Sequence, residues 1–506
     1  MDIQRDNVAI ERLIGEANEQ TVVDGEVALP GGIRDEAHIL HTSARLTLED
    51  AQVLSDRVAL TGNVVFQVLY TQGDNRPRAL EASSAFTHQM SLPGVDTHSR
   101  VKTSGQVLEA YSQAVSGRLL LHASLATSAR ALEHMPISVV TGIDGINGLE
   151  AKTETVSLMQ HVGESQTTSL LREEFDLPAS LGIQETLFAK AYPYVKNVSA
   201  ANGRVNVQGT LSIDAYHISL LQDKPLVVTR HAEPFDISLE IGATDEEDIQ
   251  VRVILKDIAV SSVDAGEGAR LLRAEGLIGV VGTASRVDDV EAVSDAYTLS
   301  GENTSLVTES VTVLSSEIAS QSVQSGKMVI ELPDGSAPVR SVLAAFIEPH
   351  IAESHALGDR QRVAGVLHAT VIYLPFGGEA PVSASVDTPF EALFQGALPE
   401  NTWIRVESQE VDAAAITSDR VELSYRLCLD ADSYILESAS LPVDVKTQAV
   451  SAGKSGIVVV YPSSGETLWD LARKYRVTQD SITKINPNLK SVQAGKPVLI
   501  LQRQKA

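Results

Sequence analysis

The sequence has one cysteine and few aromatic residues. A single cysteine, Cys428, excludes an intramolecular disulfide and is typical of a chain made in a reducing compartment. Cys428 lies in an alternating segment, residues 421–429, so we interpret it as a packed strand residue rather than a nucleophile. Phe, Trp and Tyr make up 4% of the 506 residues, which argues against the stacking platforms of proteins that bind single-stranded nucleic acid.

Long apolar runs are also missing. The best candidate, residues 276–282, falls far short of the roughly 18 residues that a membrane helix needs, and its composition favours a buried strand. Residues 1–8 contain no basic region followed by an apolar core, so we expect no secretory signal. These features predict a chain made in the cytoplasm, without membrane insertion.

Basic charge is scarce in the body of the chain and concentrated near its end. The net charge is −26. Residues 457–506 contain eight basic and three acidic residues, a net charge of +5, which leaves −31 for residues 1–456. A strongly acidic body repels nucleic acid and anionic membranes, so we expect neither as a partner.

No arrangement of residues indicates an enzyme. The densest group of potential metal ligands comprises Glu348, His350, Glu353 and His355, but Pro349 and the alternating pattern indicate a strand edge and a turn. No P-loop, dinucleotide fingerprint or G-x-S-x-G motif is present, and no acidic pair stands out as a general acid and base. We therefore predict no catalytic residue, no metal site and no cofactor.

A weak repeat runs through the acidic body. A Leu-Pro pair occurs three times, at intervals of 148 and 155 residues, after a segment of mixed apolar and Glu/Gln residues. Each pair is followed by an Arg-Val strand start with a nearby glycine, then by a tyrosine and a phenylalanine. The pairs are Leu29-Pro30, Leu177-Pro178 and Leu332-Pro333; the tyrosines are Tyr70, Tyr216 and Tyr373; the phenylalanines are Phe86, Phe235 and Phe390.

Repeated short strands separated by turns predict a mainly β fold of tandem, sandwich-like repeat domains. Periodicity leaves open whether the segments before each Leu-Pro are helical or form an extra strand. We expect β domains at residues 5–148, 149–303 and 304–445. Residues 446–456 are small, polar and glycine-containing, so we expect a flexible linker to a last module at residues 457–501.

The last module has local signals for a β-α-α-β order. Residues 457–460 are β-branched and suit a strand. Thr467 stands at a helix N-cap with Asp470 three residues later, and an apolar stripe follows at Leu468, Leu471, Ala472 and Tyr475. A second helix begins near Thr478 with Ile482 and Ile485 facing inward, and a strand at residues 497–501 closes the module.

This pattern resembles a LysM domain over residues 457–501. The family's Gly-Asp-Thr-Leu opening reads Gly465-Glu466-Thr467-Leu468 here, followed by Trp469, and its Asn-Pro-Asn-Leu motif is intact at residues 486–489. The resemblance implies a shallow groove for N-acetylglucosamine-containing glycans between two loops. Its residues would be Gly465, Glu466, Thr467 and Leu468 on one side, and Asn486, Pro487, Asn488 and Leu489 on the other. A purely structural role for Thr467, Leu468 and Pro487, as cap, packing residue and helix stop, is an equal alternative.

Three β units before one C-terminal LysM resemble the SipL family of spore coat morphogenetic proteins, whose β units are SPOCS domains. The resemblance implies a protein of the mother cell that is recruited to the forespore surface. It also implies that the LysM docks on a coat-basement protein similar to the ATPase SpoIVA. A binder of peptidoglycan or chitin is the alternative, and a wall hydrolase is disfavoured because residues 1–446 show no catalytic group.

Overall fold

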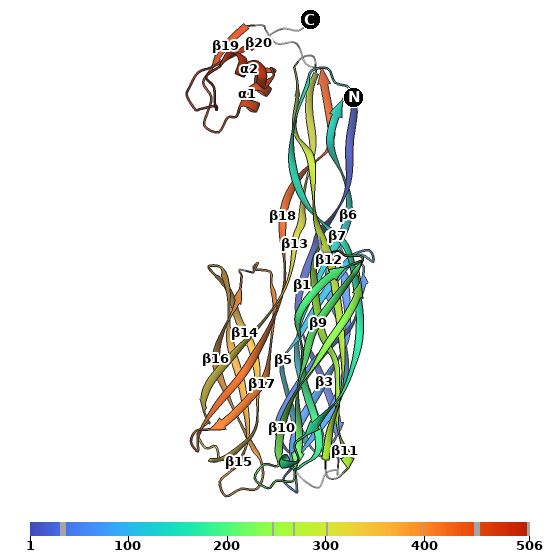
Figure 1. Cartoon of the computed structure of the whole chain (residues 1–506), viewed down its shortest axis with the longest axis vertical. Helices are drawn as coiled ribbons and strands as arrows, with labels where there is room; N and C mark the ends of the chain where they lie inside the picture. The colour runs from blue at the N-terminus through green and yellow to red at the C-terminus, as the bar shows by residue number, and fades with distance from the viewer. Residues whose placement is uncertain are drawn as a thin grey trace.

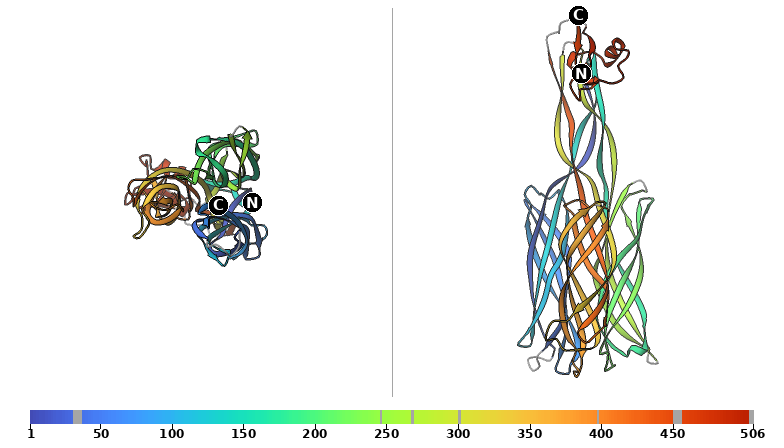
Figure 2. Two further views of the ribbon diagram at one scale, coloured as in Figure 1. Left: turned by 90° about the horizontal axis from the view of Figure 1, so that it is seen from below. Right: turned by 90° about the vertical axis from the view of Figure 1, so that its left-hand side faces the viewer.

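The computed structural model describes residues 1–30, 37–244, 247–266, 269–299, 302–396, 398–449 and 456–502. It has three β lobes side by side, a stalk that rises above them and a small head at the tip of the stalk (Figure 1). Seen along the long axis, the lobes surround a common centre (Figure 2). The fold is mainly β, as the sequence predicts.

Each lobe contains six consecutive strands in two three-stranded antiparallel sheets. In the first lobe the sheet orders are β1-β6-β5 and β2-β3-β4, and the other two lobes repeat this topology. Its strands are β1 (Asp2–Ala28), β2 (His38–Leu54), β3 (Arg57–Gln72), β4 (Arg76–Ser91), β5 (Arg100–Val115) and β6 (Arg118–Asp144).

The second lobe has β7 (Leu149–Leu177), β8 (Ile183–Ala201), β9 (Arg204–Ser219), β10 (Leu226–Glu240), β11 (Asp248–Gly266) and β12 (Ala269–Thr298), with a 3-10 turn at Ala179–Leu181. The third has β13 (Glu302–Glu331), β14 (Val339–Leu357), β15 (Arg360–Pro375), β16 (Val382–Gln395), β17 (Trp403–Ala415) and β18 (Arg420–Ala449). Alternate residues of the central strands, such as Phe66 and Val68 in β3, are buried between the two sheets of a lobe.

The glycine and phenylalanine that recur in the sequence form a cross-strand pair in each lobe. Gly62 lies opposite Phe86, and the same register joins the equivalent residues of the other lobes, Gly209 to Phe235 and Gly365 to Phe390. A Cβ atom on Gly62 would lie only 2.9 Å from the Phe86 ring. The phenylalanine therefore fills the space that the glycine leaves empty.

The recurring tyrosine does not have the same place in all three lobes. Tyr70 and Tyr373 follow their glycines by eight residues and point into their lobes, whereas Tyr216 follows Gly209 by seven. Because strand side chains alternate, Tyr216 faces outward instead and stacks on Phe346 of the third lobe, with ring centroids 5.0 Å apart.

His217 takes the interior position in the second lobe. Its ring nitrogens lie 2.9 Å from the Thr186 hydroxyl and 2.7 Å from the Thr229 hydroxyl. Burial lowers the pKa of His217 to about 4, which keeps the ring neutral.

The segments before each Leu-Pro pair are strands, which settles the alternative that periodicity left open. They are β1, β7 and β13, and each pairs along its length with the last strand of its lobe. Beyond the lobes these pairs continue as three two-stranded ribbons that form the stalk (Figure 1). All three ribbons contribute to its apolar core, which includes Ile10, Val139, Leu158, Val290, Val313 and Leu441.

The chain passes from the stalk to the head between Ala449 and Gly456. Because β18 continues to Ala449, residues 446–449 of the expected linker are strand. Residues 450–455 of that linker lie outside the described residues.

The head has the predicted β-α-α-β order, with β19 (Gly456–Val460), α1 (Leu468–Tyr475), α2 (Gln479–Ile485) and β20 (Val498–Gln502). Both helices pack on one face of the two-stranded sheet, around Leu471 and Ile482. The prediction that Ile485 faces inward is wrong, because α2 ends at this residue and its side chain is exposed.

Candidate functional site

Thr467 caps helix α1, as its position before the apolar stripe predicts. Its hydroxyl accepts a hydrogen bond from the Asp470 backbone N–H at 3.2 Å, and the Asp470 carboxylate accepts one from the Thr467 N–H at 2.8 Å. The hydrogen bond from the Thr467 hydroxyl to this carboxylate lowers the pKa of Asp470. Thr467 thus has a complete structural role in the capping box.

The loop before α1 is held by Glu466. The Glu466 carboxylate accepts a hydrogen bond from the Ser463 N–H at 2.7 Å and lies 3.5 Å from Lys474 Nζ. Gly465 has a φ of 88°, in the left-handed region that favours glycine. The residues of this loop are therefore fixed by the turn itself.

Asn486 joins the second helix to the last strand. Its side-chain amide donates to the carbonyls of Ile482 at 2.8 Å and Leu499 at 2.7 Å, and its Oδ1 accepts from the Leu499 N–H at 2.9 Å. With its hydrogen bonds used in this way, Asn486 positions the second loop.

The eight predicted groove residues divide equally by exposure. One exposed pair lies on each loop: Gly465 and Thr467 on the first, Pro487 and Asn488 on the second. The half-buried residues are Glu466, Leu468, Asn486 and Leu489. Leu468 and Leu489, one from each loop, pack against the same core of the head.

The head is docked on the stalk through strand β12, where the sequence predicted a module on a flexible linker. Trp469 Nε1 and Arg473 Nη1 each donate to the Asp295 carboxylate at 2.8 Å, and the Tyr297 hydroxyl donates to the Val477 carbonyl at 2.8 Å. The Tyr297 and Trp469 rings meet edge to face with centroids 5.0 Å apart. Sequence reasoning missed Asp295 and Tyr297, because nothing in their strand pattern distinguishes them from neighbouring residues.

The sheet of the head exposes an apolar strip, formed by Ile457, Val459 and Leu499 and continued by Tyr461 directly after β19. Their exposed fractions are 73%, 51%, 39% and 66%. Val459 lies directly opposite Leu499, so these side chains share the face of the sheet that the helices leave uncovered. The β-branched run at residues 457–460 predicted the strand but not which of its residues remain exposed.

Two parts of the chain match models of known families. Residues 463–500 match the model described as LysM domain. This part of the chain is a LysM domain. Residues 37–114 match the model described as SipL, SPOCS domain, which spans β2 to β5 of the first lobe. The chain therefore combines a SPOCS domain with a C-terminal LysM domain, as the sequence predicts.

The other two lobes repeat the strand order of the matched segment. The strands equivalent to β2–β5 are β8–β11 in the second lobe and β14–β17 in the third. No curated protein and no solved structure matches the chain.

The remaining candidate groups give no positive sign of catalysis. Among the described residues, no group of three or more His, Cys, Asp or Glu side chains could hold a metal ion. Cys428 is buried in β18, and burial raises the pKa of its thiol to about 12, so it stays protonated. In the part of the chain that the structure describes, no helix has the length and apolarity of a membrane-spanning segment.

Proposed function

We propose that the chain is a non-enzymatic adaptor of spore coat morphogenesis, whose LysM docks onto a coat-basement protein similar to SpoIVA. The SPOCS and LysM domains support a sporulation-associated protein with a binding module. Both domain types are non-catalytic. The lobes and the stalk hold the LysM at one end of an elongated body, where it is accessible to a surface (Figure 1).

The apolar strip is the observation that carries this proposal. Four large apolar side chains on one small module form the kind of exposed patch that marks a protein interface. A protein surface can bury such a strip, whereas hydrogen-bonded recognition of a sugar draws on polar side chains.

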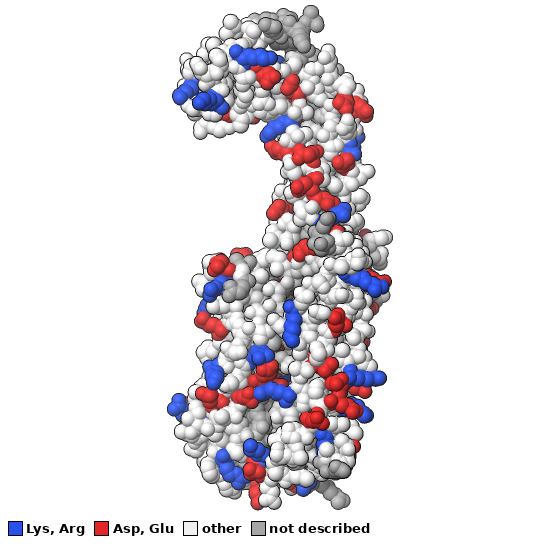
Figure 3. All heavy atoms as spheres, viewed as in Figure 1, with Lys and Arg blue, Asp and Glu red and all other residues white. Residues whose placement is uncertain are grey.

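The distribution of charge also favours binding of a partner at the head. Basic side chains are visible on the head and acidic ones along the stalk (Figure 3). A partner that approaches the head with an acidic surface is attracted there and repelled by the body. In this arrangement the exposed loop residues Gly465, Thr467, Pro487 and Asn488 contribute the rim of the interface.

Binding of the full chain to a purified SpoIVA-like ATPase, measured by biolayer interferometry, tests the proposal. The double variant Ile457→Asp/Val459→Asp places two charges on the strip without touching the core, and we expect it to abolish binding. Lys490→Ala, exposed on the same head, is the control. Unchanged affinity of a double variant with the unfolding temperature of the native chain would contradict docking through the strip.

A glycan-binding LysM is the second candidate, because Thr467 and Asn488 are exposed on the two loops of the LysM groove. It predicts binding of N-acetylglucosamine oligomers in calorimetry, with loss of the heat signal in Asn488→Ala. No heat with the native chain would exclude this candidate.

The proposed site of action is the mother-cell side of the forespore surface. A fluorescent fusion should form a ring around the forespore during sporulation. Diffuse fluorescence throughout the mother cell would count against the adaptor function.

A further inference from the structure

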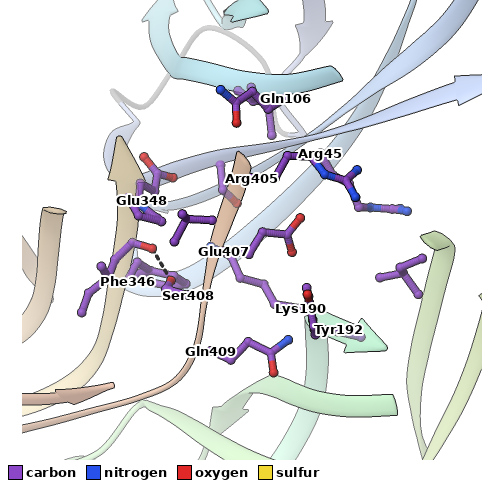
Figure 4. Close-up of a pocket in the computed structure, with 18 of the residues that line it drawn as sticks. Arg45, Gln106, Lys190, Tyr192, Phe346, Glu348, Arg405, Glu407, Ser408 and Gln409 are labelled. Atoms are coloured by element: carbon purple, nitrogen blue, oxygen red, sulfur yellow. Dashed lines mark hydrogen bonds between the residues drawn. The ribbon is translucent and has the colours of Figure 1, made fainter. Parts of the chain in front are cut away.

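A cavity of about 310 Å³ lies between the three lobes, far from the LysM. Its walls come from β2, β3 and β5 of the first lobe, β8, β9 and β11 of the second, and β14, β17 and β18 of the third. Figure 4 shows charged side chains from all three lobes around this space. Its volume falls at the lower end of the range found for small-molecule sites.

One wall of the cavity is aromatic. The rings of Tyr216 and Phe346 stack with centroids 5.0 Å apart and belong to an apolar cluster that joins the lobes. Both rings are nearly fully buried and also stack on Phe188 and His41. The apolar surface that a ligand can reach comes from half-buried aliphatic side chains of the lining, Leu46, Leu255 and Ile351, one from each lobe.

The charges that line the cavity do not balance. Three basic side chains face five carboxylates, so the lining has an excess of two negative charges. The basic residues are Arg45, Lys190 and Arg405, and the acidic ones are Glu109, Asp214, Glu348, Glu407 and Asp430.

Several of these charges already have ionic partners. Arg405 lies 3.7 Å from Asp430. Two more pair with residues outside the lining: Arg45 lies 3.0 Å from Asp257, and Asp214 lies 3.4 Å from Arg230. These two pairs remove one positive and one negative charge, which leaves the excess unchanged.

Three further charges of the lining are those of Lys190, Glu348 and Glu407. Among the described residues, no carboxylate lies within 4.0 Å of Lys190 Nζ, and no cationic nitrogen lies within that distance of Glu407. Glu348 has only the His41 ring, 3.8 Å away, and Lys190 Nζ lies 4.8 Å from the centroid of the Phe346 ring.

The pKa values of both carboxyl groups are raised, with burial as the largest cause. Burial raises the pKa of Glu407, and the neighbouring Asp430 carboxylate adds to this shift. Burial also raises the pKa of Glu348, although Lys190 opposes it. Glu407 nevertheless keeps surface accessible to water, because it faces the cavity.

We propose that this cavity binds an aliphatic diamine or polyamine, with ammonium groups against Glu348 and Glu407 and methylene groups along Leu46, Leu255 and Ile351. A dication supplies the two positive charges that the lining lacks. Its stem suits these aliphatic side chains, which a hydrated inorganic ion would not contact. Chelation of a metal is disfavoured, since the described residues offer no group of three ligands.

Isothermal titration of the full chain with putrescine, near neutral pH and in about 0.15 M NaCl, tests the proposal. This salt concentration shortens the Debye length to about 8 Å and suppresses loose binding to a chain of net charge −26. We expect one-to-one binding, weaker binding of butylamine, and a loss of affinity of about tenfold or more in Glu348→Gln and in Glu407→Gln.

Two further variants make the result specific. Lys190→Gln removes the competing ammonium, so it should strengthen putrescine binding. Glu353→Gln alters an exposed carboxylate on the same strand as Glu348 and should leave affinity unchanged. The absence of heat with the native chain, or equal losses in Glu353→Gln and Glu407→Gln, would overturn the proposal. Thermal unfolding of each variant checks that the fold is retained.

Discussion

The stalk and the space between the lobes are filled in opposite ways, although β18 contributes residues to both. In the stalk, three ribbons approach closely and bury apolar side chains such as Val139 and Leu441. Between the lobes, charged side chains and the cavity occupy the axis. Where the strands diverge, short apolar side chains no longer meet, and the lobes are joined by larger side chains, both aromatic and charged.

Arg130 of β6 marks the change from one region to the other. Its side chain is 2% exposed and lies between the rings of Trp403 and Tyr434, 4.1 and 3.9 Å from their centroids. It also forms ion pairs with Glu16 at 3.2 Å and Asp432 at 3.1 Å. A buried charge of this kind is stable only while all of its partners are present. The stability of an apolar core, in contrast, falls gradually as side chains are shortened.

Of the substitutions considered, Arg130→Ala should reduce the stability of the chain most. This change leaves Glu16 and Asp432 without their buried counter-charge, so we expect a loss of about 3–5 kcal/mol in the free energy of unfolding. Arg118→Ala on the same strand removes an exposed ion pair with Glu26 and should change stability by less than about 1 kcal/mol. Equal losses of stability for Arg130→Ala and Arg118→Ala in urea unfolding would show that the buried charge is no more important than the exposed one.

In the stalk, Leu441→Ala should lower the free energy of unfolding by about 2–5 kcal/mol. Leu441 is fully buried among residues of all three ribbons, and its truncation leaves a cavity that the strands cannot close. Ser440→Ala, an exposed neighbour, should leave thermal unfolding unchanged. A small effect of Leu441→Ala would mean that the ribbons do not depend on a shared core.

The free energy of unfolding should depend on pH through Asp214, which lines the cavity between the lobes. Burial raises its pKa to about 6, so the folded chain retains a proton that the unfolded chain releases. The resulting stability is fully present below about pH 4 and is lost as the pH rises through about 6. Asp214→Asn should therefore be more stable than the native chain at pH 8, by at most about 3 kcal/mol, with a difference that shrinks toward pH 4. Urea unfolding at several pH values measures this, and a difference independent of pH would contradict the assignment.

The smallest change in free energy should come from a substitution at the tip of the stalk, where the LysM docks. Asp295→Ala removes the acceptor shared by Trp469 and Arg473, at a cost of about 1–3 kcal/mol in docking. We expect the LysM to leave the stalk without unfolding, which small-angle scattering would record as a longer molecule. Glu291→Ala on the same strand, which is exposed, is the matched control and should scatter like the native chain.

Local signals in the sequence were sufficient for much of the molecule. The Leu-Pro pairs mark the ends of β1, β7 and β13, and the Thr467 cap and the β-α-α-β order of the head were predicted correctly. The groove assignment remains a prediction, as do the boundaries of the β domains.

Other features depend on which surfaces meet. Trp469 lies outside the predicted apolar stripe of α1 and is buried against Tyr297, a contact between residues far apart in the chain. Tyr216 shows the same limit, because only its partner in the third lobe, Phe346, explains why it stands one residue early in its repeat.

The sequence by itself determined the mainly β fold, the alternation of its strands, the three repeats and the LysM, but not that the segments before each Leu-Pro are strands. Each of these follows from residues close together in the chain, through side-chain periodicity, turn chemistry and capping. Only the tertiary structure decided that the lead-in strands form a stalk, that the LysM docks on it and that a charged cavity lies between the lobes. Alternation specifies which face of a strand is apolar, but the packing of distant strands decides what that face contacts.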